Sequence, residues 1–101
     1  MNWLRRVLRA AFPAGCPELD LHGLRVSEAL VEVERFVARA EQQAVGEVRI
    51  VCGKGRHSPS GVGVLRLAVP GWLDAHGYAG RYRREVDRDG RDGALRVVLR
   101  R

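Results

Sequence analysis

A chain of 101 residues, 46% apolar and 30% charged, is one globular domain with a modest core, which excludes both a disordered chain and a two-domain protein. No stretch is long and uncharged enough to span a bilayer, and arginines interrupt the first apolar run, which argues against a signal peptide. Cys16 and Cys52 form no CxxC pair, so we expect two reduced thiols in a cytoplasmic protein, without a disulfide framework or a zinc site.

The net charge of +6 is distributed unevenly along the chain. Residues 1–15 carry three arginines and no acid, residues 16–48 carry seven acids and three arginines, and residues 49–101 carry twelve basic side chains and five acids. We therefore expect a basic surface for a polyanion such as nucleic acid and an acidic surface elsewhere. The ratio of 17 arginines to one lysine also fits a coding bias, so charge by itself is weak support for nucleic-acid binding.

Residues 1–17 form a predicted N-terminal extension. Apolar side chains recur there with helical spacing and leave the arginines on another side, which predicts a short basic amphipathic helix that ends near Pro13 and Gly15. We expect its aromatic side chains, Trp3 and Phe12, to pack against the domain. A basic arm that contacts a partner or a membrane surface is the alternative, and we expect no membrane attachment.

Residues 18–23, ELDLHG, alternate polar and apolar side chains. This pattern predicts a short strand that ends at its glycine and carries Asp20 and His22 on the same side. An amphipathic helix should follow, from an N-cap at Ser27 to about Gly46. The solvent-facing side of that helix is acidic, so we expect it to form the back of the molecule.

Residues 47–52, EVRIVC, predict a second strand, because β-branched residues dominate. A strand, a helix and a strand of these lengths form a βαβ unit with parallel strands. The carboxyl ends of parallel strands share an edge of the sheet, where ligands bind in open α/β sheets. The DLHG and CGKGRHS segments should therefore meet at that edge.

Four glycines between residues 53 and 63 predict a loop, and the apolar residues that follow have helical spacing from about Gly61 to His76. Pro70 and Gly71 should kink that helix or break it in two. RYRREV and ALRVVLRR, joined by DRDGRDG, predict a β-hairpin. The expected fold is α/β, an α+β sandwich of βαβαββ order: a single domain with a four-stranded mixed sheet and two main helices.

The glycine-rich stretch GKGRHSPSG leads from a strand into a helix, where backbone N–H groups and the helix dipole can surround a phosphate. It is neither a Walker A loop nor a dinucleotide fingerprint. A plain tight turn is the alternative, but the basic residues favour an anion site. The predicted phosphate-binding or nucleic-acid-binding residues of this loop are Gly53, Lys54, Gly55, Arg56 and Ser58.

The polar side chains at the same edge suit proton transfer. Histidine is suited to general acid or base catalysis near neutral pH, and Asp20 could orient His22. With His57 on the facing loop, the two imidazoles predict a site that cleaves a phosphodiester, with Asp20, His22 and His57 as catalytic residues. A turn cap for Asp20 and packing at the sheet edge for His22 are the structural alternatives. Asp20 is also a candidate ligand for Mg²⁺ or Mn²⁺, and we expect no small-molecule cofactor.

A second group of candidate nucleic-acid contacts lies near the predicted hairpin. Tyr78 and Tyr82 could stack on bases, and the neighbouring Arg81, Arg83 and Arg84 are predicted to contact nucleic acid. A half-buried strand with a solvated arginine side is an equally good interpretation of the same residues.

The ordered set of motifs resembles the Smr (small MutS-related) domain over residues 18–101. The segments that carry the resemblance are LDLHG at 19–23, an acidic amphipathic helix, VCGKGRHS at 51–58, GVLRLAVPGWL at 63–73 and DGRDGALRVVL at 89–99. The resemblance implies an α/β sandwich similar to the C-terminal domain of translation initiation factor 3, and DNA-nicking, RNA-cleaving or nucleic-acid-binding activity. It places the LDLH motif on residues 19–22 and the glycine-loop motif on residues 53–55. Cys52 stands where the family often has Thr or His.

The sequence therefore predicts a monomeric Smr protein that binds nucleic acid and acts as an endonuclease on DNA or RNA. The alternative is a non-catalytic module that recognises branched or structured nucleic acid. An RNA substrate would supply its 2′-hydroxyl as an internal nucleophile, whereas DNA would need an activated water.

Overall fold

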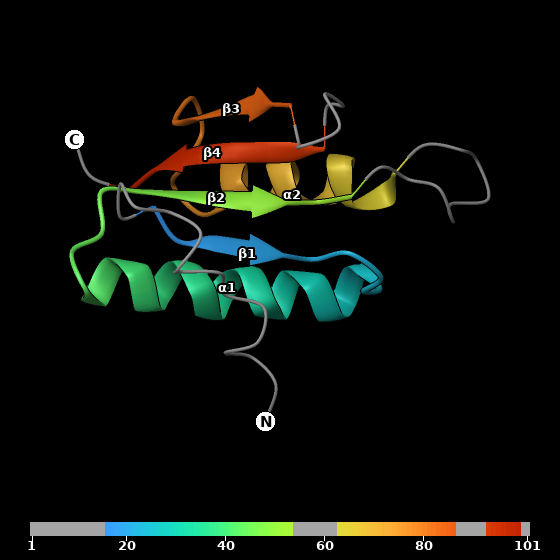
Figure 1. Ribbon diagram of the computed structural model, residues 1–101, viewed down its shortest axis with the longest axis horizontal. Coiled ribbons are helices and arrows are strands. Elements are labelled where there is room, and N and C mark those ends of the chain that lie inside the picture. The colour runs from blue at the N-terminus through green and yellow to red at the C-terminus, as the bar shows by residue number, and fades with distance from the viewer. Residues whose placement is uncertain (1–15, 54–62, 87–92, 100–101) are drawn as a thin grey trace.

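The computed structural model describes residues 16–53, 63–86 and 93–99 (Figure 1). The elements are β1 (Glu18–Asp20), α1 (Val26–Gln42), β2 (Glu47–Val51), α2 (Val64–Ala75), β3 (Tyr82–Glu85) and β4 (Ala94–Val98). This confirms the predicted βαβαββ order and the hairpin formed by the last two strands. The predicted helix within residues 1–15 lies outside the described residues.

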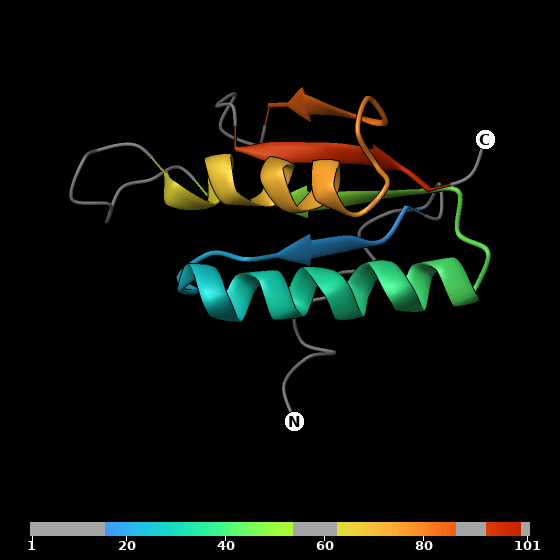
Figure 2. The ribbon, with the colours of Figure 1, turned by 180° about the vertical axis from the view of Figure 1, so that it is seen from behind.

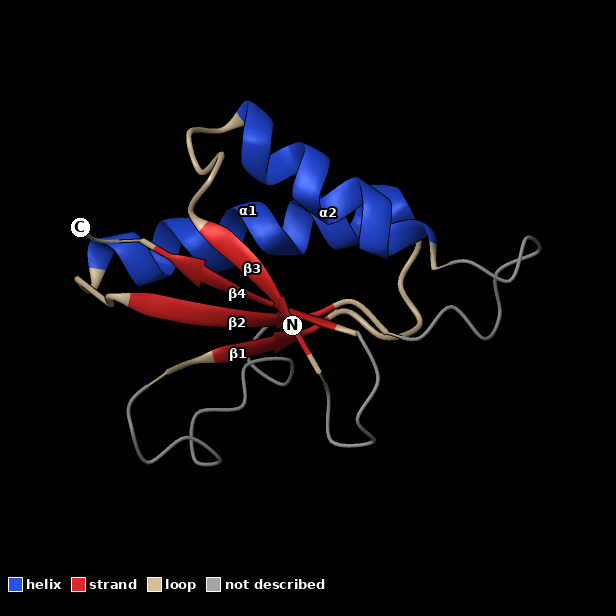
Figure 3. Ribbon diagram, turned by 90° about the horizontal axis from the view of Figure 1, so that it is seen from above, coloured by secondary structure: helices blue, strands red, loops and turns tan. Residues whose placement is uncertain are grey.

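The four strands form one mixed sheet in the order β1-β2-β4-β3. β1 and β2 are parallel, as predicted, and β4 is antiparallel to both of its neighbours. The carboxyl ends of β1, β2 and β3 therefore lie at the same edge. Both helices pack on one face of the sheet, which makes a two-layer sandwich (Figure 3), and α2 crosses β2 and β4 when seen from behind (Figure 2). Within the described ranges, neither helix is long and apolar enough to cross a membrane.

The ends of α1 differ from the predicted ends. The helix begins at Val26, so Ser27 is not the N-cap; Arg25 is, and its backbone N–H donates to the Glu28 carboxylate at 3.0 Å. The helix ends at Gln42 because Ala44 adopts a left-handed φ of 59°. The N–H groups of Ala44 and Val45 then bond the carbonyls of Glu41 and Ala40, the pattern of a Schellman motif.

The second helix, α2, is continuous through Pro70, so of the two predicted alternatives at Pro70 and Gly71 the break was wrong and the kink stays a prediction. A proline has no N–H to donate to the carbonyl four residues earlier, which here belongs to Arg66. The guanidinium of Arg84, on strand β3, donates to that carbonyl at 3.2 Å. A residue from the neighbouring sheet thus supplies the hydrogen bond that the proline removes.

The core lies between the helices and the covered face of the sheet. Alternation along β2 turns Val48 and Ile50 toward the helices, and both are fully buried. The largest fully buried side chains are Leu19, Leu21, Ile50, Leu73, Leu95, Val33, Val48, Val69 and Val97. These side chains come from both helices and from three strands, so their burial holds the two layers together.

Ile50→Val should lower the free energy of unfolding by about 1 kcal/mol, because it removes one buried methylene from a well-packed site. Urea denaturation at neutral pH measures this change. Val86→Ala is the matched control: its side chain is 61% exposed, so we expect a change within about 0.5 kcal/mol. Equal losses in the two variants would contradict the assigned core.

The face of the sheet that neither described helix covers, called the uncovered face below, carries a row of charged side chains. The strand registers align Glu18, Arg49, Arg96 and Arg83 across all four strands. Glu85 lies between two of these arginines: its carboxylate accepts from Nε of Arg49 at 3.1 Å and from Nε of Arg96 at 2.7 Å. Arg49 also contacts the Glu18 carboxylate. The sheet therefore pairs basic side chains with acids from other parts of the chain on this face.

Candidate active site at the carboxyl ends of strands β1 and β2

The DLHG segment forms a tight turn, and the prediction that its strand extends to Gly23 was wrong. β1 ends at Asp20, and the Leu21 N–H donates to the Val51 carbonyl at 2.9 Å. The Leu24 N–H then donates to the Leu21 carbonyl at 3.1 Å, with Gly23 at a φ of 82°. A positive φ at the third position is the signature of a type II turn and favours glycine there. His22 thus occupies the second position of the turn.

Asp20 closes this turn with its side chain. Its Oδ1 accepts a hydrogen bond from the His22 backbone N–H at 2.9 Å, which is an Asx-turn contact. On either side of Asp20, Leu19 and Leu21 are fully buried, whereas His22 is exposed. The residues of the LDLH motif therefore have different roles. The leucines pack in the core, the aspartate bonds the backbone of the turn, and the histidine faces solvent.

The glycine-loop segment approaches His22 from β2. Gly53 has a φ of 95°, and its N–H and that of Cys52 both point at the Gly93 carbonyl, at 3.4 and 2.8 Å. A Cβ atom added to Gly53 would lie 3.9 Å from Nδ1 of His22. The two segments therefore meet at the same edge of the sheet, as the βαβ unit predicts.

The thiol at position 52 lies on the other side of this segment. Cys52 is 6% exposed and belongs to the hydrophobic core cluster. Its side chain therefore packs in the core, whereas His22 faces solvent. The difference between Cys52 and the Thr or His that the family often has here therefore affects the packing of the core beneath the site, and not the solvent-facing group at His22.

Several predicted site residues lie outside the described residues. They are Lys54, Gly55, Arg56, His57 and Ser58. The anion site on the loop and the second imidazole therefore stay predictions. Asp20, His22 and Gly53 are the predicted site residues that the structure brings together.

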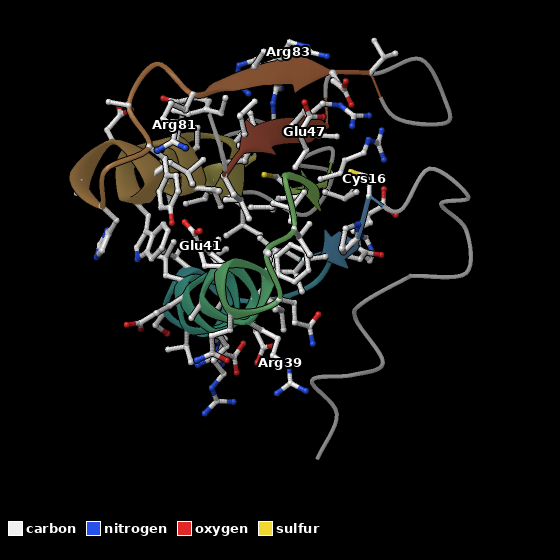
Figure 4. The ribbon with its side chains drawn as sticks, turned by 90° about the vertical axis from the view of Figure 1, so that its left-hand side faces the viewer. Cys16, Arg39, Glu41, Glu47, Arg81 and Arg83 are labelled. Atoms are coloured by element: carbon white, nitrogen blue, oxygen red, sulfur yellow. The ribbon has the colours of Figure 1, made fainter. Side chains whose placement is uncertain are left out.

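The three arginines near the hairpin do not share one surface. Arg84 turns toward the helices and bonds the Arg66 carbonyl, whereas Arg83 lies on the uncovered face, 3.6 Å from the Glu85 carboxylate. Arg81, labelled in Figure 4, directly precedes β3. It therefore lies at the amino end of β3, whereas His22 follows the carboxyl end of β1 at the opposite edge of the sheet. The predicted nucleic-acid contacts of these arginines therefore belong to three separate places.

The hydroxyl groups of both tyrosines near the hairpin bond carboxylates of the helices. The Tyr78 hydroxyl donates to Glu41 of α1 at 2.6 Å, and the Tyr82 hydroxyl donates to Asp74 of α2 at 2.9 Å. Burial and the bond to Glu41 raise the pKa of Tyr78 to about 12. The Arg81 guanidinium lies 5.5 Å from the centre of the Tyr78 ring. Tyr78 thus ties the segment between α2 and β3 to α1, and Tyr82 ties β3 to α2.

The prediction that Asp20 binds Mg²⁺ or Mn²⁺ stays a prediction. Among residues 16–53, 63–86 and 93–99, no three His, Cys, Asp or Glu side chains gather in a group that could hold a metal ion. One carboxylate oxygen of Asp20 already accepts from the His22 N–H. Any further ligands would have to come from outside these ranges or from the substrate.

A two-layer sandwich of βαβαββ order, with a histidine-bearing turn facing a glycine at the carboxyl ends of two parallel strands, defines the class of protein. The family described as the Smr domain matches residues 19–100, and the chain belongs to that family. The structure resembles the crystal structure of the Smr domain of Thermus thermophilus MutS2, with a TM-score of 0.69 and 31% identity over 83% of this chain and 98% of that one.

Two relatives give the wider context. An uncharacterized protein of Treponema pallidum is 40% identical over 96% of this chain and 46% of its own length. Endonuclease MutS2 of Clostridium botulinum is 34% identical over 95% of this chain and 12% of its own length. The chain thus spans less than half of either relative, and it corresponds to a small part of the endonuclease.

Proposed function

We propose that this Smr domain binds nucleic acid and cleaves phosphodiester bonds, with His22 as a proton-transfer residue. The observation that carries the proposal is the position of the exposed imidazole, whose Nδ1 lies 3.9 Å from the Cβ position of Gly53. A substrate phosphate bound at the glycine loop would be within reach of that ring. The similarity to Endonuclease MutS2 supports cleavage as the reaction.

On an RNA substrate, His22 would take the proton of the 2′-hydroxyl while that oxygen attacks phosphorus. The bond from phosphorus to the 5′-oxygen breaks, the leaving oxygen takes a proton, and the products are a 2′,3′-cyclic phosphate and a 5′-hydroxyl. His57 is the candidate for the second proton transfer. Loop N–H groups, with Lys54 and Arg56, would stabilise the charge that develops on the phosphorane. On DNA, an activated water would replace the 2′-hydroxyl as the nucleophile.

The test uses the purified chain with labelled single-stranded RNA, nicked DNA and branched DNA, each with Mg²⁺ or with EDTA. We expect cleavage of at least one substrate by the wild type, and binding without cleavage by His22→Ala. His76→Ala is the matched control, because His76 is also exposed but caps the far end of α2. Binding of every substrate without cleavage would leave a non-catalytic binding module as the function. Binding that does not weaken as salt rises would contradict contacts with phosphate.

A further inference from the structure

We propose that Asp20 is a positioning residue, which holds the imidazole of His22 against Gly53 through the His22 backbone and does not act through its negative charge. The inference rests on the proposed function of His22 in proton transfer. It assigns to the aspartate of the LDLH motif a role that an uncharged hydrogen-bond acceptor can fill.

Three hydrogen bonds fix the turn that carries His22. Two of them join backbone groups: Leu21 N–H to the Val51 carbonyl at 2.9 Å, and Leu24 N–H to the Leu21 carbonyl at 3.1 Å. These two bonds form whatever side chain occupies position 20. The third, from the His22 N–H to Oδ1 of Asp20 at 2.9 Å, is the only one of the three that depends on a side chain.

The third bond also acts on the peptide that sets the direction of the imidazole. The His22 N–H belongs to the plane between residues 21 and 22, so its bond to Asp20 fixes that plane and, through it, the Cα–Cβ direction of His22. Asp20 itself is held by the sheet, where it pairs with Val51. The aspartate therefore fixes the exposed side chain of His22 relative to the sheet.

The bond from the His22 N–H to Asp20 needs an acceptor oxygen but no charge, which distinguishes a positioning role from a role that depends on the negative charge. The Asp20→Asn substitution would keep a carbonyl oxygen at the place of Oδ1 and would remove the charge, whereas Asp20→Ala would remove both. A metal ligand or an electrostatic partner of the imidazole needs the charge. A turn cap needs only the acceptor, and both asparagine and aspartate side chains form such turns.

The experiment compares Asp20→Asn, Asp20→Ser and Asp20→Ala in the full chain by NMR and by cleavage of whichever labelled substrate the wild type cuts: single-stranded RNA, nicked DNA or branched DNA. For Asp20→Asn we expect the wild-type NOE between the His22 ring protons and the Gly53 Hα protons, and kcat within about twofold. For Asp20→Ala we expect loss of that NOE, exchange of the His22 amide about five- to tenfold faster, and kcat about 10- to 100-fold lower with KM nearly unchanged. Asp20→Ser, with a weaker acceptor, should fall between them.

Two results would overturn the proposal. If Asp20→Asn keeps the NOE but is as inactive as Asp20→Ala, the charge of Asp20 is required. If Asp20→Ala keeps both the NOE and the slow amide exchange, Asp20 does not hold the turn. A wild type that cleaves nothing, with the expected NMR differences among the variants, would refute the proposed function and leave the positioning role in place. Thermal unfolding of each variant verifies that it is folded.

Discussion

His22→Ala should lower kcat/KM for the cleaved substrate by about 10²- to 10⁴-fold, the range for loss of a positioned general acid or base. The side chain is exposed, so the substitution removes no core contact and should leave the free energy of unfolding unchanged within about 0.5 kcal/mol. Binding of the substrate should persist, because the proposed phosphate contacts are backbone and basic groups of the glycine loop and not His22. Steady-state kinetics and urea denaturation measure the two quantities on the same preparation.

Imidazole in the buffer provides a sharper form of this test. The alanine leaves space beside Gly53 for a free imidazole, which should restore part of the lost rate in His22→Ala and should not accelerate the wild type. His76→Ala, the exposed histidine at the far end of the domain, should keep its rate within about twofold. A His22→Ala protein that retains more than about a tenth of the wild-type rate would contradict proton transfer by this residue.

Glu85→Gln should lower the free energy of unfolding by about 1 to 3 kcal/mol at neutral pH. The Glu85 carboxylate accepts charge-assisted hydrogen bonds from both Arg49 and Arg96, and its side chain is 21% exposed, so solvent screens it only in part. The bond from Arg96, reinforced by Arg49 and opposed by partial burial, lowers the pKa of Glu85. A glutamine keeps the volume of the side chain and removes its charge.

The lowered pKa of Glu85 gives this prediction a pH dependence of fixed sign. The unfolded carboxyl binds protons at a higher pH than the folded one, so the stabilisation is present above the ordinary glutamate pKa and is lost as the pH falls through the folded value. The difference between wild type and Glu85→Gln should therefore shrink from pH 7 toward pH 3. Urea unfolding across this range measures it. Glu34→Gln, an exposed carboxylate on α1, is the control and should change little.

A difference that stays constant or grows toward acid pH would show that Glu85 contributes through packing and not through its charge. Loss of stability in Glu85→Gln with no loss in Glu34→Gln would support the cross-sheet network. Glu85 joins side chains from β2 and β4, so its replacement also tests the uncovered face as a structural element.

Local pattern was sufficient for the order of the elements. Alternation identified β1, β-branched residues identified β2, and a turn segment between two runs identified the hairpin of β3 and β4. Helical spacing identified both helices, and the strand–helix–strand lengths predicted that β1 and β2 are parallel. The same reasoning placed DLHG and the glycine loop at one edge, and the structure confirms the approach of His22 to Gly53. These features follow from sequence because periodicity and chain connectivity act over short distances.

Contacts between residues far apart in the chain decided the rest. Pro70 stays inside a helix because Arg84, from another element, bonds the carbonyl that the proline leaves without a donor. Arg83 and Arg84 follow one another along β3 and so point to opposite faces of the sheet, and the packing of both helices on one face decides that Arg84 turns toward the helices. A single sequence carries no signal for which distant donor meets which acceptor.

The DLHG turn shows the same division. The sequence itself determined that an aspartate, a histidine and a glycine lie at the end of a short strand. Tertiary structure decided what they do: pairing with Val51 ends the strand at Asp20, Gly23 turns the chain, and the Asp20 carboxylate bonds the His22 N–H. The physical reason is that β1 ends where its pairing with β2 ends, so the place at which the turn begins depends on β2, and Asp20 and Gly23 then set the direction of His22 within that turn.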